Sequence, residues 1–139
     1  MSEKQKLLIV DDSEFNRDIL KEILGSSYDY LEAENGNQAI QILEVHPEID
    51  LMFLDINMPQ MNGFQVLEHM RELRWIDEVP VVMISSEESV EIMRKAYDLG
   101  ITDYISRPFD AIIVKKRVQN TLGLYANQKR LINVVVDQV

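Results

Sequence analysis

The sequence predicts an α/β domain in which helices cover both faces of a parallel sheet. Short apolar runs alternate with longer segments in which apolar residues recur every three or four positions, and this pattern repeats five times. Strands and helices that alternate in this way form a parallel sheet, and right-handed crossovers place helices on both of its faces. The length of 139 residues suits a single domain.

Three strands and two helices are predicted in the first half of the chain. The strands are the runs 6–10, 28–33 and 49–54. The second run is the least apolar, which favours a place near an edge of the sheet. Apolar residues recur every four positions from Phe15 to Ile23, and Gly25 ends this first helix. The second helix begins after Asn35 and stops before Pro47.

The second half of the chain continues the pattern with two strands and three helices. The strands are 80–84 and 103–106, and Pro108 stops the latter. One helix carries the apolar positions of Phe64–Met70. Another carries those of Val90–Tyr97 and is stopped by Gly100, and the last helix begins near Asp110.

Charge and composition exclude several classes of function. The chain has 24 acidic and 14 basic residues and a formal net charge of -10, so its field disfavours direct binding to nucleic acid. It has no cysteine, which excludes disulfides and thiolate metal sites. The apolar run at the N-terminus is too short for a signal peptide or a membrane span. We therefore expect a cytoplasmic protein without a membrane partner.

Polar residues follow four of the five predicted strands. Asp11 and Asp12 end the first strand, Asp55 the third, Ser85 the fourth and Arg107 the fifth. Each of them, taken alone, has an ordinary interpretation as a helix cap, a turn residue or a surface charge. The carboxyl ends of parallel strands meet at one edge, however, where open α/β sheets bind their ligands. The sequence therefore predicts one site that contains all five residues.

Three carboxylates at this edge raise one another's pKa, and a divalent cation removes that penalty. All of the expected ligands are oxygen atoms, which favours a hard ion such as Mg²⁺, or Mn²⁺, over zinc. A hydroxyl group and a cation at the same rim can bind the oxygens of a phosphoryl group.

Four blocks of sequence resemble the receiver domain of two-component response regulators. The blocks are Asp11-Asp12, Asp55–Gly63 (DINMPQMNG), Val82–Ser86 and Gly100–Phe109. The resemblance runs from about Lys6 to Tyr125 and implies a three-layer, flavodoxin-like (βα)5 domain with strand order 2-1-3-4-5. It assigns residues 1–125 to a response regulator receiver domain. It also implies a cytoplasmic signalling switch of a phosphorelay rather than an enzyme with turnover.

The resemblance also implies roles for the site residues. Asp55 is the expected phosphoacceptor, and it takes the phosphoryl group from a sensor histidine kinase or phosphotransfer protein to form an aspartyl phosphate. Asp12, Asp55 and the backbone carbonyl of Asn57 are the expected metal ligands, with Asp11 acting through water. Arg107 is expected to contact the phosphoryl group or Asp55, aimed by a cis bond to Pro108.

Four further roles are implied for polar and aromatic positions near the site. Ser85 is expected to bond the phosphoryl group, and Tyr104 is then expected to turn inward. This change alters the surface of the fourth helix, fifth strand and fifth helix, which signals to an output domain or partner. Asn57 and Glu87 are expected to tune dephosphorylation.

Arg107 supports an alternative function, because the family usually has lysine at this position. The alternative is a receiver-like protein-interaction module that does not switch by phosphorylation. Two other classes of this architecture are disfavoured. A flavodoxin needs a loop rich in Ser, Thr and Gly where this chain has Asp11-Asp12, and a haloacid-type phosphatase needs D-x-D.

Residues 126–139 have two interpretations. Val118, Tyr125 and Ile132 lie seven apart, as in a helix that pairs two chains, but Gly123 and Gln128 weaken the pattern. This segment is either a frayed tail of the last helix or a helical extension. An extension leads to an output domain missing from this chain or supports a homodimer, for which the surface of the fourth helix, fifth strand and fifth helix is the other candidate.

Overall fold

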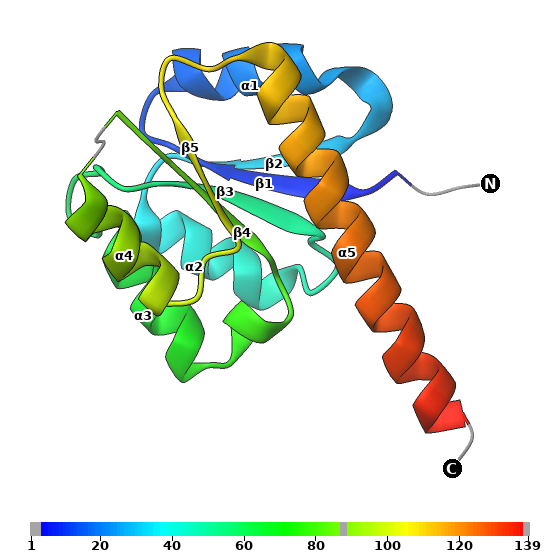
Figure 1. The fold of residues 1–139 in the computed structure, drawn as a ribbon. Coiled ribbons are helices and arrows are strands. Elements are labelled where there is room, and N and C mark those ends of the chain that lie inside the picture. Colours follow the sequence, from blue (N-terminus) through cyan, green and yellow to red (C-terminus); the bar gives the residue numbers. More distant parts are fainter. Residues whose placement is uncertain (1–3, 87–88, 138–139) are drawn as a thin grey trace.

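The computed structural model describes residues 4–86 and 89–137. Five parallel strands form one sheet in the order β2-β1-β3-β4-β5, which confirms the predicted architecture and strand order (Figure 1). The strands are β1 Lys6–Val10, β2 Asp29–Ala33, β3 Leu51–Asp55, β4 Val81–Ser85 and β5 Asp103–Ser106. The least apolar strand, β2, lies at an edge of the sheet, as its composition predicted.

Five helices cover the two faces of the sheet, so the domain has three layers. They are α1 Glu14–Leu24, α2 Gly36–Val45, α3 Gly63–Glu72, α4 Val90–Asp98 and α5 Ala111–Asp137, with short 3₁₀ turns at Gly25–Ser27 and Trp75–Asp77. Helices α1 and α5 lie on one face, and α2, α3 and α4 lie on the other (Figure 1).

The core divides into two apolar clusters because successive strand residues point to opposite faces. Leu7 and Ile9 pack toward α1 and α5, together with Phe53 of β3. Leu8 and Val10 pack toward α2, α3 and α4. All these strand residues are fully buried, as expected for a parallel sheet covered on both faces.

Two strands extend one residue further than the sequence suggested. The strand β3 includes Asp55, and β4 includes Ser85, because both residues still pair in the ladder with β4 and β5, respectively. Pro80 precedes β4 rather than starting it, although its carbonyl accepts the Met52 N–H at 3.0 Å. The two polar residues are therefore the last residues of their strands and are held by the sheet itself.

Side chains cap the first four helices where the chain leaves the sheet, and Asn35 is the cap of α2. Ser13 caps α1, and its Oγ accepts a hydrogen bond from the Asn16 N–H at 3.3 Å. Asn62 and Gln65 form a capping box on α3. Ser89 caps α4, so Ser85 does not serve as that cap. Ser13 rather than Asp12 supplies the side-chain cap of α1, which leaves Asp12 available at the strand end.

The last helix is one continuous element from Ala111 to Asp137 and extends beyond the sheet (Figure 1). Its first half packs on the sheet through Val114, Val118 and Leu122. Gly123 does not interrupt it. Among the described residues, no helix is both long and apolar enough to span a bilayer.

Candidate functional site

The site is built by the register of the parallel strands. Val10 pairs with Leu54, so Asp11 and Asp55 follow at the same level of neighbouring strands. Asp55 pairs with Ile84, which places Ser85 one step further along β4. Ser85 in turn pairs with Ser106, and Arg107 comes next in the chain. The sheet thus brings together residues that are up to 96 positions apart in the sequence.

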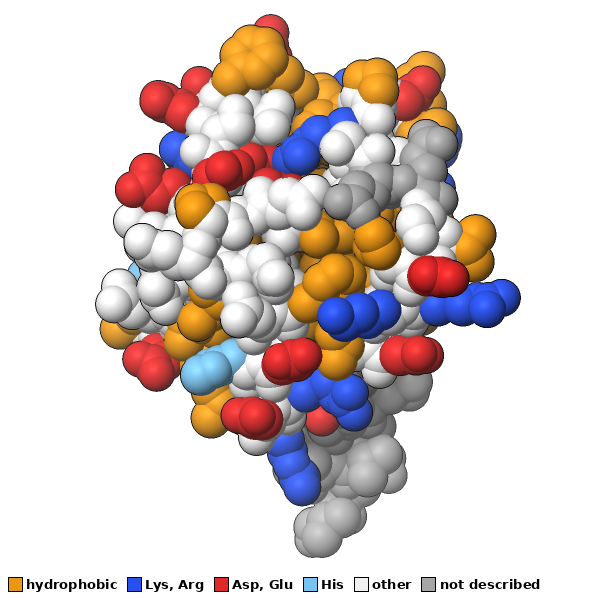
Figure 2. Space-filling view, turned by 90° about the vertical axis from the view of Figure 1, so that its left-hand side faces the viewer, with side chains coloured by type: hydrophobic (Ala, Val, Ile, Leu, Met, Phe, Trp, Pro, Cys, Tyr) orange, Lys and Arg blue, Asp and Glu red, His pale blue; other side chains and the backbone are white. Residues whose placement is uncertain are grey.

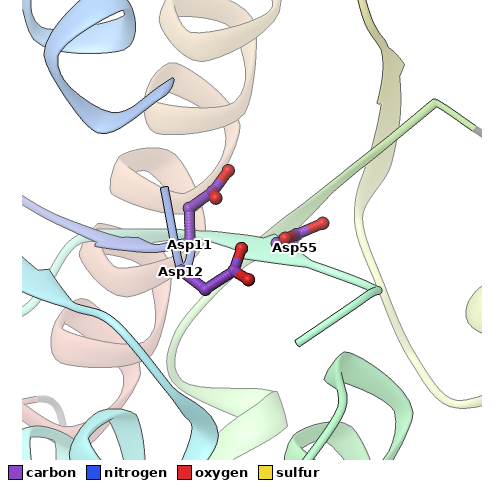
Figure 3. Close-up of side chains that lie close together, drawn as sticks. All are labelled: Asp11, Asp12 and Asp55. Carbon is purple, nitrogen blue, oxygen red and sulfur yellow. The ribbon is translucent and has the colours of Figure 1, made fainter. Parts of the chain in front are cut away.

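Three carboxylates converge at this edge, as the sequence predicted. Asp11, Asp12 and Asp55 each offer one oxygen atom, and these atoms all lie within 4.8 Å of one another (Figure 3). Asp11 and Asp12 come from the end of β1, and Asp55 comes from the end of β3. Among residues 4–86 and 89–137, this is the single acidic or histidine-containing group with such spacing.

Two of the three carboxylates are buried. Asp11 is 0% exposed and Asp55 is 2% exposed, whereas Asp12 is exposed. The Ser13 N–H donates to Asp11 Oδ1 at 2.9 Å, and the Asn57 N–H donates to Asp55 Oδ1 at 3.3 Å. Backbone donors therefore orient both buried acids from the loops that follow them.

Burial raises the pKa of both acids. It is the largest effect on Asp55, the charge of Asp11 adds to it, and together they raise the pKa of Asp55 to about 6 although Arg107 opposes them. Burial also raises the pKa of Asp11, while the Ser13 N–H and Arg107 lower it. The site thus holds negative charge at a cost, which a bound cation would relieve.

Arg107 reaches into the cluster from the end of β5. Its Nη2 donates to Asp11 Oδ2, and its Nη1 lies 3.4 Å from Asp55 Oδ1. The Arg107 N–H donates to the Ser85 carbonyl at 2.9 Å, which anchors the backbone. The bond between Arg107 and Pro108 is cis, as predicted. Contact with Asp55 was expected, but the closer partner is Asp11.

Ser85 and Tyr104 are both buried in this structure. Ser85 is 0% exposed at the end of β4. Tyr104 is 4% exposed and packs in the cluster that faces α2, α3 and α4. Tyr104 pairs with Met83, two positions before Ser85. The aromatic side chain is therefore buried in the unphosphorylated domain, whereas the family resemblance implies that it turns inward after phosphorylation.

One of the two remaining predicted positions lies in a loop that the structure describes. Asn57 is exposed in the loop after β3. Glu87 lies outside the described residues. The loop after β3 passes very close to the strand, since a Cβ atom on Gly63 would lie 2.5 Å from the Asp55 carbonyl oxygen. The glycine of the DINMPQMNG block is thus required by the close approach of α3 to Asp55.

Two basic residues near the site were not predicted. Arg17 on α1 donates to the Asp11 carbonyl at 2.6 Å and pairs with Glu32 at 3.0 Å. Arg17 lies four residues after Ser13, one helical turn from the cap. This spacing is the sequence signal that could have indicated that Arg17 lies near the end of β1. Arg117 on α5 donates to the Tyr104 carbonyl, a contact that depends on how α5 packs on β5 and has no signal in the sequence.

An open groove of about 480 Å³ adjoins the acidic cluster. Its lining residues are Phe15, Asn16, Ile19, Ser86, Arg107, Pro108 and Phe109. Figure 2 shows the face at which the strands end, where acidic and basic side chains lie side by side beneath exposed hydrophobic groups. Phe15 is 72% exposed at the start of α1. The site is therefore charged on one side and apolar on the other.

Comparison with known families places this arrangement among receiver domains. The model of the response regulator receiver domain matches residues 7–119. A chemotaxis protein CheY homolog of Campylobacter jejuni is 32% identical over 120 residues, which is 85% of this chain and 92% of the relative. The chemotaxis protein CheY1 of Helicobacter pylori is 34% identical over 120 residues, covering 85% of this chain and 97% of the relative.

Three further matches involve longer or structurally known proteins. A probable cyclic di-GMP phosphodiesterase of Vibrio cholerae is 32% identical over 127 residues, which is 91% of this chain but 29% of that protein. The crystal structure of the chemotaxis protein CheY4 of Vibrio cholerae has a TM-score of 0.78 at 27% identity, covering 86% of this chain and 99% of that one. A response regulator/GGDEF domain protein has a TM-score of 0.82 at 25% identity, covering 88% and 51%.

Proposed function

Because the chain belongs to the response regulator receiver domain family, we propose that it accepts a phosphoryl group on Asp55. The donor is a phosphohistidine on a sensor histidine kinase or phosphotransfer protein. The observation that carries the proposal is the convergence of three carboxylates, a guanidinium and a buried serine at one sheet edge. Receiver domains act as signalling switches, and we do not expect multiple turnover.

The reaction uses the ionised carboxylate of Asp55 as the nucleophile. One carboxylate oxygen attacks phosphorus, and the P–N bond to the donor histidine breaks. The bonding electron pair goes to the imidazole nitrogen, and the donor histidine leaves as neutral imidazole because its other ring nitrogen carries a proton. The product is an acyl phosphate on Asp55. With a pKa of about 6, most of the Asp55 carboxyl is ionised at neutral pH.

The donor set fits a hard divalent ion, Mg²⁺ or Mn²⁺. All three clustered side chains offer carboxylate oxygens, within 4.8 Å of one another. Asp12, Asp55 and the Asn57 carbonyl would hold the ion directly, and Asp11 would act through water. The bound ion would supply charge neutralisation for the phosphoryl oxygens.

Ser85 and Arg107 are the proposed partners of the remaining phosphoryl oxygens. Ser85 ends the strand beside Asp55, and Arg107 already lies 3.4 Å from an Asp55 oxygen. A hydroxyl group and a guanidinium are both donors to phosphate oxygens. A bond from Ser85 to the phosphoryl group is the proposed trigger that couples the site to Tyr104 and the surface of α4, β5 and α5.

The lifetime of the aspartyl phosphate is proposed to depend on Asn57 and Glu87. Both have polar side chains that could orient a hydrolytic water, and Asn57 is exposed next to the cluster. We expect self-dephosphorylation in the presence of Mg²⁺. An acyl phosphate that persists for many hours without a phosphatase would contradict this role.

The output of the switch is proposed to be an attached domain or a partner protein. The relatives include both chemotaxis proteins of similar length and longer proteins named for GGDEF or cyclic di-GMP functions. In this chain the α5 helix continues to Asp137, in the place where a connection to an output domain would begin. Pairing of two chains through α5, or through the surface of α4, β5 and α5, is the other proposed route. The net charge of -10 disfavours direct binding of nucleic acid by this domain.

The alternative is a receiver-like interaction module that does not switch by phosphorylation. Two observations favour it. The guanidinium of Arg107 already contacts the acids, and Tyr104 is already buried. A module of this kind would keep one surface regardless of its phosphorylation state.

Intact mass measurement with a small phosphodonor separates the two proposals. Wild type and Asp55→Asn are incubated with acetyl phosphate and MgCl₂. We expect wild type to gain one phosphoryl group and the variant none. A wild type that gains no phosphoryl group would favour the interaction module.

A further inference from the structure

The guanidinium of Arg107 spans two of the three clustered carboxylates. Nη2 donates to Asp11 Oδ2, and the longer contact, 3.4 Å, joins Nη1 to Asp55 Oδ1. A residue that served only the phosphoacceptor would face Asp55 alone. The planar guanidinium of arginine can donate hydrogen bonds to two acids at once, which a single ammonium group does less well.

Asp11 has a donor on each of its two oxygens. Oδ1 accepts the Ser13 N–H at 2.9 Å, and Oδ2 accepts Arg107 Nη2. The side chain of Asp11 is fully buried, so water does not screen these contacts. A divalent ion that contacts Asp11 through a water molecule must share one of these oxygens. It must therefore lie close to the guanidinium. The two cations therefore repel each other across the same carboxylate.

The adjoining groove offers the guanidinium a second position. Arg107 lines this groove, which has a volume of about 480 Å³. The Arg107 Cζ lies 5.9 Å from the centre of the Phe109 ring, at the outer limit of a cation–π contact. The Arg107 Nε is buried and has no hydrogen-bond partner among the described residues. The contact with the acids thus leaves one donor unsatisfied, and a position over the Phe109 ring would expose it to water.

We propose that Arg107 is an internal cation that competes with the divalent ion for Asp11, and that metal binding moves its guanidinium into the groove beside Phe109. This inference rests on the proposed function, because it presumes that a divalent ion binds the acidic cluster. In the metal-free site the guanidinium then offsets part of the negative charge of the acids. The affinity for Mg²⁺ is then lower than the three carboxylates alone would give.

Titration calorimetry with MgCl₂ tests the competition without any activity assay. The proteins are wild type, Arg107→Gln, Arg107→Lys and the control Lys116→Gln. The control removes one positive charge from the exposed surface of α5. We expect Arg107→Gln to bind Mg²⁺ at least about tenfold more tightly than wild type. Arg107→Lys should lie between them, and Lys116→Gln should stay within about twofold of wild type.

A second readout follows the guanidinium itself. In ¹⁵N NMR spectra of wild type, MgCl₂ should shift the Arg107 Nε–H signal together with the ring signals of Phe109. Phe109→Leu removes the ring and should weaken Mg²⁺ binding by about twofold or more, since the displaced cation loses its contact.

The outcomes distinguish this inference from the proposed function. Equal Mg²⁺ affinity in wild type, Arg107→Gln and Arg107→Lys would overturn the competition and leave the metal site intact. Weaker binding in both Arg107 variants would also overturn it. If none of the proteins binds Mg²⁺ or Mn²⁺, the metal requirement of the proposed function fails instead.

Discussion

Arg117 on α5 donates a hydrogen bond to the backbone carbonyl of Tyr104 on β5. Its second partner is the Asp103 carboxylate, whose Oδ1 lies 3.2 Å from Arg117 Nη1. The Asp103 Oδ1 also accepts the Tyr104 N–H at 2.8 Å. One arginine therefore links the long helix to the strand that carries the proposed switch residue.

Replacing Arg117 should loosen this link and destabilise the domain. The Asp103 pair is partly exposed and contributes little, so most of the loss comes from the hydrogen bond to the Tyr104 carbonyl. We expect Arg117→Gln to lower the free energy of unfolding by about 1 kcal/mol. Urea unfolding measures it, with Lys116→Gln as the control on the exposed side of α5. Equal losses in the two variants would remove any special role for Arg117.

Asp55→Asn should stabilise the metal-free protein at neutral pH. The folded-state pKa of about 6 lies above the unfolded value of about 4, so the folded protein binds the proton more tightly between these values. Stability from this group is therefore greatest at low pH and is lost as pH rises from 4 to 6. Since the side chain is buried, the loss is roughly 3 kcal/mol.

Urea unfolding with EDTA at pH 4 and pH 7.5 measures this effect. The free energy of unfolding of the variant should exceed that of wild type by up to about 3 kcal/mol at pH 7.5 and should show no such gain at pH 4. The difference between the unfolding free energies of the two proteins cancels the contributions of the titrating groups that they share. A gain of the same size at both pH values would contradict the raised pKa of Asp55.

Asp12→Asn should weaken Mg²⁺ binding without harming the fold. Asp12 is exposed, and Ser13 supplies the helix cap next to it. We expect Mg²⁺ to raise the melting temperature of wild type, EDTA to reverse the rise, and the variant to need at least about tenfold more Mg²⁺. The control is Glu22→Gln, which also removes one negative charge, at an exposed position of α1. A normal Mg²⁺ response in Asp12→Asn would exclude Asp12 as a ligand.

Two glycine substitutions should act in opposite directions. In Gly63→Ala the new Cβ would lie 2.5 Å from the Asp55 carbonyl oxygen, so we expect a loss of about 2–3 kcal/mol. In Gly123→Ala nothing lies within 4 Å of the new atom, and the helix gains up to about 1 kcal/mol. Thermal unfolding of both variants checks this. A Gly63→Ala protein as stable as wild type would show that the loop after β3 can move away from Asp55.

Much of the fold could be predicted because each strand has a clear apolar run and each helix has a clear period. The ends of β3 and β4 were placed one residue early, since a polar residue marks the end of an apolar run although the ladder still includes it. The acidic cluster was predictable because parallel strands share one edge. The order of the elements alone brings these strand ends together, whatever the detailed packing of the helices.

The partners of the two arginines could not be predicted in the same way. Arg107 lies closer to Asp11 than to Asp55, and this difference depends on the side-chain conformation of Arg107 within a buried pocket. The contact between Arg117 and the Tyr104 carbonyl depends on how α5 packs on β5. The inward position of Tyr104 depends on the space among the side chains of the core. A linear pattern carries no information on any of these.

The C-terminal part of α5 extends well beyond its last described contact with the sheet. The Tyr125 hydroxyl lies 3.3 Å from the Thr102 hydroxyl, a contact that ties the helix to the end of the sheet just before β5. Residues 126–137 continue as helix from there and rise about 18 Å at about 1.5 Å per residue. A tilt of α5 by about 10° at the contact between Tyr125 and Thr102 would displace residue 137 by roughly 3 Å. A small movement of β5 that tilted α5 at this contact would therefore produce a larger displacement at residue 137.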